Sequence, residues 1–150
     1  MTEYVEIGVG EAFEIGEGGL NFRVLQRSVD EDGGVSIEVC GAVEGAETQL
    51  IRFDLFRGDP HYHVPASEPK PIRLEGKSPD EAMDFALQCI RERLTELLGE
   101  AGYPQLGDAA SSAQCAEAAR RVEEAARQAP APSDFQRIEL TPEVRRALGE

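Results

Sequence analysis

Apolar and polar residues alternate along the first half of the chain, in short runs separated by turns rich in glycine. Residues 49–56 are typical, because Ile51 and Phe53 fall on one side of an extended chain and Asp54 falls on the other. This period of two predicts β-strands that bury one face. Turns such as residues 30–34 are much shorter than a parallel crossover. The pattern therefore predicts an antiparallel meander of about four to six strands.

A proline-rich stretch follows the last clear strand. Residues 58–71 contain Pro60, Pro65, Pro69 and Pro71. Proline cannot donate a hydrogen bond to a sheet ladder, so this stretch is predicted to be an edge or an extended loop. Residues 72–74 are then predicted to form a short final strand.

The clearest helix signal begins at Ser78. This residue is a good N-cap, Pro79 suits the first helical position, and Glu81 completes a capping box. Apolar residues then recur three and four positions apart, as one buried helix face requires. They are Met83, Leu87, Ile90, Leu94, Leu97 and Leu98. Packed on the apolar face of the sheet, this long helix would complete an α+β core domain, assigned to residues 1–103.

The last third of the chain is predicted to add a second helix and a tail. Residues 108–128 are rich in alanine and are predicted to be helical, within a satellite segment assigned to residues 104–129. Alanine and proline make residues 129–132 a stiff linker. Beyond it we expect an extended segment and a short helix that ends at Leu148. This tail, residues 130–150, is predicted to dock on its own domain or on a partner.

The charge of the chain narrows its expected partners. The 29 acidic and 15 basic residues leave a formal net charge of −14. Phosphate backbones and anionic membranes attract basic surfaces, so neither nucleic acid nor a membrane is expected as a partner. The three cysteines are widely spaced and odd in number, which is atypical of a disulfide framework. They favour a reducing, cytoplasmic setting.

Both histidines lie in one short polar segment, residues 52–63. In an extended chain His61 and His63 project to the same face, so together they can hold a metal ion. Asp54 or Asp59 would supply an oxygen ligand. Two histidines and one carboxylate are the donor set of open zinc sites and of non-haem iron sites. The cofactor that this interpretation predicts is a divalent metal such as Zn or Fe.

The same segment also supports metal-free chemistry. One histidine would act as a general base near neutral pH, with Asp54 orienting its ring. An arginine would hold an anionic substrate through paired hydrogen bonds. The candidate catalytic residues are therefore His61, His63, Asp54 and Arg52, and the candidate ligand-binding residues are Arg57, Tyr62 and Asp59.

A purely structural interpretation explains the segment as well. Arg52 and Asp54 fall on the same strand face as the outward arginines of residues 20–28. Cross-strand ion pairs on a solvated face would account for both. His61 and Tyr62 would then simply cover an edge of the sheet.

Residues 56–63, Phe-Arg-Gly-Asp-Pro-His-Tyr-His, resemble a motif of small uncharacterised prokaryotic domains. The resemblance extends over the middle third of the chain. It implies no known activity and no assigned residue.

Two functions from different classes remain open. The first is a small acidic interaction or accessory domain that binds a protein partner and self-associates as a homodimer. Self-association would use a free sheet edge or the alanine-rich helix. The second is a small metal-binding or acid–base enzyme that acts on a small molecule and uses His61 and His63 with Asp54, Asp59 and Arg52.

Overall fold

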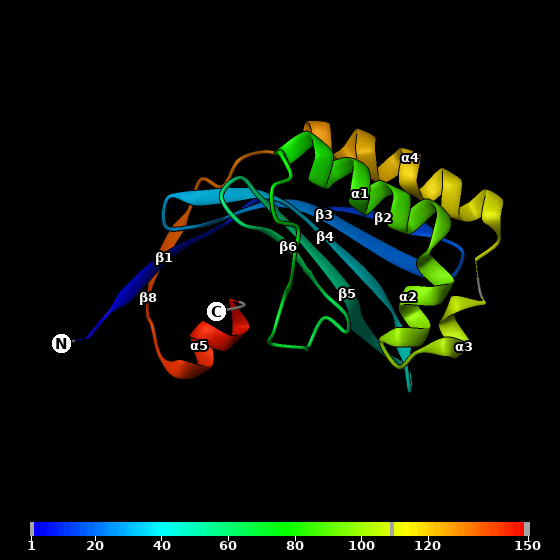
Figure 1. Ribbon diagram of the computed structural model, residues 1–150, viewed down its shortest axis with the longest axis horizontal. Coiled ribbons are helices and arrows are strands. Elements are labelled where there is room, and N and C mark those ends of the chain that lie inside the picture. The colour runs from blue at the N-terminus through cyan, green and yellow to red at the C-terminus, as the bar shows by residue number, and fades with distance from the viewer. Residues whose placement is uncertain (1, 109, 149–150) are drawn as a thin grey trace.

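A curved antiparallel sheet forms one layer of the molecule, and helices cover one of its faces (Figure 1). The structure is a computed structural model that describes residues 2–108 and 110–148. The last two residues of the predicted tail, 149 and 150, lie outside the described residues. The strands are β1 (Tyr4–Val9), β2 (Phe13–Glu17), β3 (Leu20–Val29), β4 (Asp32–Val43), β5 (Ala46–Phe56), β6 (Pro60–His63), β7 (Ile72–Arg73) and β8 (Phe135–Glu139). The helices are α1 (Pro79–Glu92), α2 (Leu94–Glu100), α3 (Pro104–Gly107), α4 (Ser112–Gln128) and α5 (Pro142–Ala147).

Over the described residues the sheet has eight strands, in the order β7-β6-β5-β4-β3-β1-β8, and β2 also pairs with β3. All of these pairings are antiparallel. The predicted α+β class and antiparallel sheet are confirmed, but the predicted strand count was too low. The proline-rich stretch, predicted to be an edge or an extended loop, contributes β6, which lies between β5 and β7. Strand β6 begins at Pro60, because proline is tolerated at the first residue of a strand. Strand β8 finds its partner, β1, at the opposite end of the chain, which local periodicity does not reveal.

The alternation along the strands separates two faces of the sheet. Phe22, Ile37 and Phe53 are at most 1% exposed and belong to the core that the sheet shares with the helices. Fully burying one such side chain contributes about 1.5–3 kcal/mol to stability. Residues of the other parity, such as Ser36 and Asp54, therefore lie on the opposite face.

Helix α1 begins as its capping signals predict. The Ser78 hydroxyl accepts a hydrogen bond from the Glu81 backbone, and the Glu81 side chain accepts one from the Ser78 backbone. The prediction of one long helix was wrong beyond Glu92. At Arg93 the backbone leaves helical geometry, with φ −125° and ψ 12°, and α2 turns away from the line of α1 (Figure 1). The break keeps the apolar stripe on the core, since Leu94, Leu97 and Leu98 remain buried.

Helix α4 lies beside α1 on the same face of the sheet (Figure 1). Its buried face consists mainly of small side chains, with Ala118, Ala119 and Val122 at most 2% exposed. Small residues allow helix backbones to approach closely, which compensates in packing for the little area that each one buries.

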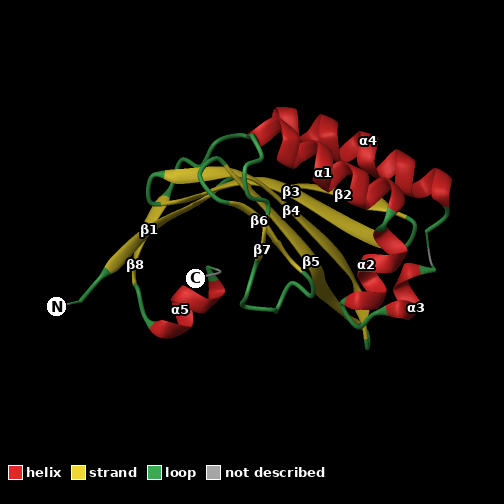
Figure 2. Cartoon of the chain, in the orientation of Figure 1, coloured by secondary structure: helices red, strands yellow, loops and turns green. Residues whose placement is uncertain are grey.

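The tail returns to the start of the chain. Strand β8 pairs with β1 from Tyr4 to Gly8. A Cβ at Gly8 would lie 2.7 Å from the Phe135 ring and 2.8 Å from Pro132, so glycine permits this close approach. Helix α5 then lies on the face of the sheet opposite α1 and α4 (Figure 2).

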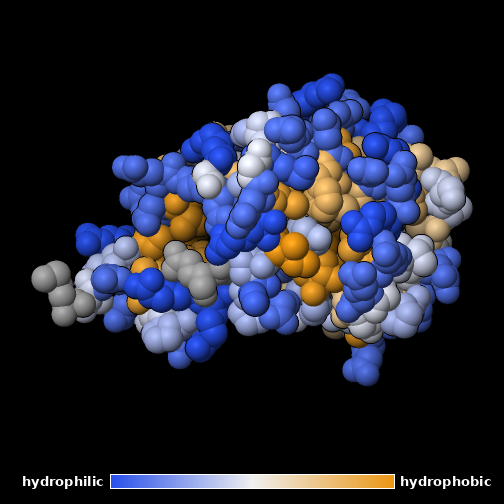
Figure 3. All heavy atoms as spheres, in the orientation of Figure 1, coloured by the Kyte–Doolittle hydropathy of each residue, from blue (hydrophilic) through white to orange (hydrophobic). Residues whose placement is uncertain are grey.

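Hydrophilic residues dominate the face of the molecule seen in Figure 3, with smaller apolar areas between them. Among the described residues, no helix combines the length and the apolar character that crossing a bilayer would need.

Candidate functional site

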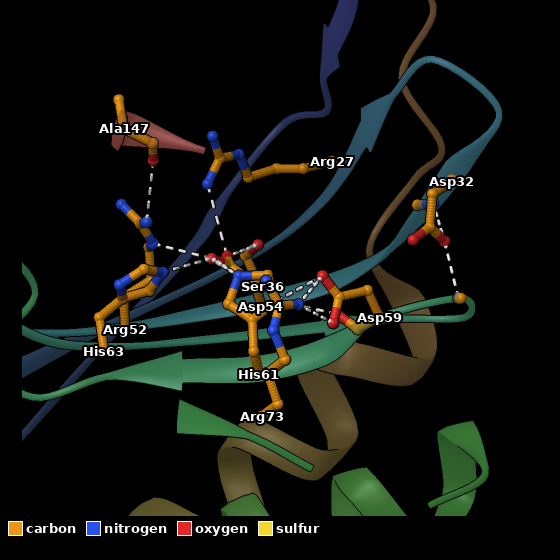
Figure 4. Close-up of polar contacts among 12 residues, drawn as sticks. Arg27, Asp32, Ser36, Arg52, Asp54, Asp59, His61, His63, Arg73 and Ala147 are labelled. Carbon is orange, nitrogen blue, oxygen red and sulfur yellow. Dashed lines mark hydrogen bonds and ion pairs between the residues drawn. The ribbon is translucent and has the colours of Figure 1, made fainter. Parts of the chain in front are cut away.

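The pairing of β5 with β6 brings the polar segment together on the sheet face that α1 and α4 leave free. His61 lies directly opposite Asp54, and His63 lies directly opposite Arg52. On the other side of β5, Ser36 of β4 also lies opposite Asp54. Residues that face each other across an antiparallel pair share a face, so one row across three strands carries Ser36, Asp54 and His61. Figure 4 shows these side chains converging on the Asp54 carboxylate.

Both imidazole rings direct one nitrogen at the same carboxylate oxygen. His61 Nε2 lies 3.2 Å from Asp54 Oδ2, and His63 Nε2 lies 3.8 Å from it. The ring centroids of the two histidines are 5.1 Å apart. The three residues are at most 2% exposed. The structural interpretation, which placed Arg52 and Asp54 on a solvated face, was therefore wrong about the environment of Asp54. The cross-strand ion pairs that it expects are present, between Arg27 and Asp54 and between Arg23 and Glu38.

The other nitrogen of each ring is held by a backbone carbonyl. His61 Nδ1 lies 2.8 Å from the Asp59 carbonyl oxygen, and His63 Nδ1 lies 2.7 Å from that of Glu68. A carbonyl oxygen only accepts, so each Nδ1 carries the proton and donates it. In a neutral imidazole the lone pair is then on Nε2. Among the described residues, neither Nε2 has a hydrogen-bond partner, although both atoms are buried.

Asp54 is anchored from several sides. Ser36 Oγ donates to Oδ1 at 2.8 Å, and Arg52 Nε donates to Oδ2 at 2.9 Å. Arg27 approaches Oδ1 at 3.5 Å. Burial by itself would raise the pKa of this carboxyl group. The neighbouring His61, Arg52 and Arg27 outweigh burial and hold the pKa of Asp54 well below its usual range. Asp54 is therefore ionised at neutral pH.

The two histidines differ in basicity. Burial acts to lower the pKa of His61, but the carboxylate of Asp54 and the carbonyl of Asp59 outweigh it and raise this pKa above its ordinary value. Burial and the charge of Arg52 lower the pKa of His63, despite the hydrogen bond to Glu68. His63 is therefore the neutral ring at physiological pH, with a buried lone pair on Nε2.

Asp54, His61 and His63 form a donor set with the dimensions of a metal site. The three donor atoms all lie within 4.8 Å of one another. Ligands bound at about 2.0–2.2 Å with inter-ligand angles of about 90–109° lie about 3.0–3.5 Å apart. The 3.2 Å separation falls in this range, and the 3.8 Å separation exceeds it by only a few tenths of an ångström. The carbonyls on Nδ1 are the outer partners that orient histidine ligands in metal sites.

Not all of the predicted site residues join this cluster. Asp59 contributes its backbone carbonyl, whereas its half-exposed carboxylate pairs with Arg73, so Asp54 is the carboxylate nearest to both Nε2 atoms. Tyr62 points to the helix-covered face, where its ring stacks on Phe53 with centroids 5.5 Å apart. Arg57 is exposed, and its guanidinium donates to the Glu31 carbonyl.

Ser36 and Arg27 hold Asp54 but were not among the predicted site residues. Their alternation places both on the correct face. Only the pairing register puts Ser36 opposite Asp54, and local periodicity leaves that register open. The Glu68 carbonyl carries no residue-type signal at all, because any residue offers the same backbone group.

The fold and this cluster together define a small α+β domain with a buried pair of histidines around one carboxylate. Residues 14–128 match the family described as domain of unknown function (DUF7700), and the chain belongs to that family. The resemblance of the histidine segment to uncharacterised domains is confirmed by this match. Neither a curated protein nor a solved structure matches the chain. The matched region contains the whole cluster and ends before β8 and α5.

Proposed function

We propose that the protein binds one divalent transition-metal ion through Asp54 Oδ2, His61 Nε2 and His63 Nε2. The observation that carries this proposal is the buried, unpartnered Nε2 of His63. A buried acceptor without a partner costs about 1–3 kcal/mol. This cost is removed when a cation accepts the lone pair of His63 Nε2.

A proton is the main competitor for this place. A proton on His61 Nε2 would satisfy that ring and Asp54, which is only 3.2 Å away. It would leave His63 Nε2 without a donor, because Nδ1 of His63 is already committed to Glu68. A divalent cation at the centre of the cluster serves all three donor atoms at once. Metal binding therefore accounts for more of the geometry than a protonated histidine does.

The donor set indicates the class of metal and of chemistry. Imidazole and carboxylate ligands without a thiolate suit Zn²⁺ or Fe²⁺. Three protein ligands leave coordination positions open, as in catalytic sites, whereas structural zinc sites are closed by four protein ligands. We therefore propose that the bound metal acts on a small molecule, either as a Lewis acid or by activating water.

Elemental analysis and calorimetry test the proposal. Protein stripped with a chelator is titrated with Zn²⁺ or, under anaerobic conditions, with Fe²⁺. One ion per chain is expected. His63→Ala should abolish stoichiometric binding, and Asp54→Asn, which keeps the shape of the side chain, should weaken it strongly. Asp84→Asn, which changes an exposed aspartate of α1, is the matched control, and it should bind one ion like the wild type.

Two results would contradict the proposal. The first is wild-type protein that binds clearly less than one ion of either metal per chain. The second is His63→Ala or Asp54→Asn protein that retains its circular dichroism spectrum and binds metal as the wild type does.

A further inference from the structure

A hollow of about 350 Å³ lies on the side of Arg52 and Glu68, two residues that contact the histidine–aspartate cluster. It is lined by residues 66–69 together with Arg52, Arg146 and Ala147. Two of the lining residues contact the cluster. Arg52 Nε donates to Asp54 Oδ2, and the backbone of Glu68 accepts the hydrogen bond of His63 Nδ1. The hollow and the candidate metal site are therefore neighbours joined by shared residues.

Each arginine of the hollow has a donor group that the protein engages only weakly. The Nη2 atom of Arg52 makes a long contact, 3.4 Å, with the Ala147 carbonyl at the end of α5 (Figure 4). Arg146 lies 3.9 Å from Glu143, and both side chains are more than half exposed. Such an exposed pair is worth at most about 1 kcal/mol. The Arg146 guanidinium can therefore turn to a ligand at small cost, and Arg52 can offer its Nη2 while its Nε stays on Asp54.

The charge around the proposed metal favours an anion. Asp54 contributes one negative charge, whereas Arg27 and Arg52 contribute two positive charges. A divalent ion would add two more, and with neutral imidazoles three positive charges would be in excess. The other arginines on this face are matched already, Arg23 by Glu38 and Arg73 by Asp59. Glu68, the carboxylate that lines the hollow, is exposed and offsets only one charge. Excess buried charge is costly unless a counter-charge is bound.

We propose that the hollow binds a small oxyanion, carrying a carboxylate or phosphate group, between Arg52 and Arg146 and beside the metal. This inference rests on the proposed metal site and names the class of its substrate. Guanidinium groups recognise both oxyanions through paired hydrogen bonds. A volume of 350 Å³ corresponds to about twelve water molecules at about 30 Å³ each, so the ligand is small. The terminal helix α5 supplies Arg146, so the tail completes the hollow.

Calorimetric titration with malonate and, separately, with inorganic phosphate tests the proposal. The wild-type protein is first loaded with Zn²⁺ and its zinc content is measured. One anion per chain is expected. Arg146→Ala should weaken anion binding by at least about tenfold, the loss expected from removing one charged hydrogen-bond partner. Its zinc content should not change, because Arg146 does not touch the cluster. Arg91→Ala, which removes an exposed arginine of α1, is the matched control and should bind the anion like the wild type.

The outcomes separate this inference from the proposed function. Tighter binding of malonate assigns the ligand to the carboxylates, and tighter binding of phosphate assigns it to the phosphates. Stoichiometric zinc without saturable anion binding, or equal anion affinity in the Arg146→Ala and Arg91→Ala variants, overturns the anion proposal and leaves the metal site intact. Zinc-free protein is expected to bind the anion at least about tenfold more weakly. Equal affinity with and without zinc overturns the claim that the anion lies beside the metal.

Discussion

Replacing Asp54 by asparagine in metal-free protein measures how much the fold depends on the charge of this carboxylate. Asp54 uses one oxygen to accept from Ser36 and the other to accept from Arg52. Asparagine has a single acceptor oxygen and no charge, so at least one of these hydrogen bonds is lost. Hydrogen bonds to charged groups contribute about 1.5–3 kcal/mol each. We therefore expect Asp54→Asn to lower the free energy of unfolding by about 1.5–3 kcal/mol near pH 5.

The loss of unfolding free energy caused by Asp54→Asn should become smaller both when the pH falls below 5 and when it rises above 5. Burial acts to raise the pKa of Asp54, but the surrounding cations and hydrogen bonds outweigh it and lower this pKa. The ionised carboxylate therefore stabilises the folded protein fully above the unfolded value of 3.8, and this stabilisation disappears as the pH falls. Burial acts to lower the pKa of His61, but Asp54 outweighs it and raises this pKa. The stabilisation from the His61 proton is therefore complete below the unfolded value of 6.5 and is lost as the pH rises through the folded value. The asparagine variant lacks both contributions, so its deficit should be largest between these two values.

Urea unfolding in the presence of a chelator gives the measurement at pH 3, 5 and 8. Far-ultraviolet circular dichroism is the suitable signal, because the chain has no tryptophan. Asp59→Asn is the control, since Asp59 and Arg73 form a half-exposed pair that should be worth at most about 1 kcal/mol. The reasoning is refuted if Asp54→Asn costs no more than Asp59→Asn at pH 5, or if its cost is equal at all three pH values.

Three further predictions concern the metal, the thiols and self-association. At a free Zn²⁺ concentration of about 100 times Kd, binding should stabilise the folded protein by about 2.7 kcal/mol. In a domain of this size that raises Tm by about 5–11 °C, and differential scanning calorimetry should show no such rise for His63→Ala. Burial raises the pKa of all three thiols, that of Cys40 to about 11. Ellman's reagent at pH 8 should therefore label the native protein slowly and the unfolded protein at three sites. Rapid labelling of the native protein would contradict the burial of the thiols. The homodimer expected from the sequence stays a prediction: β8 ends the sheet with Phe135 exposed, and analytical ultracentrifugation that finds only monomer at high concentration would be evidence against it.

Much of the local structure follows from the sequence because its causes are local. Alternation at Ile51, Phe53 and Asp54 assigns these residues to opposite faces of a strand, and the structure confirms that assignment. The capping box at Ser78 and Glu81 begins α1 where the sequence predicts. The spacing of His61 and His63 places both rings on one face, and their centroids lie 5.1 Å apart. Each of these features depends on neighbours only a few residues away.

The site required information that no local pattern holds. Which aspartate faces the histidines depends on the register between β5 and β6, and the pairing puts Asp54 rather than Asp59 opposite His61. The proton positions on both rings depend on two backbone carbonyls, that of Asp59 just before β6 and that of Glu68 after it.

By itself, then, the sequence determined most of the central strands, the start of α1, the two faces of the sheet and the chemical types available on each face, because side-chain periodicity and capping act over single turns and strands. The tertiary structure alone decided that Asp54, His61 and His63 on the polar face are buried rather than solvated. The pairing register and the returning tail place Arg27, Arg52 and α5 around Asp54. Such contacts join residues up to 95 positions apart, so they depend on how the whole chain packs.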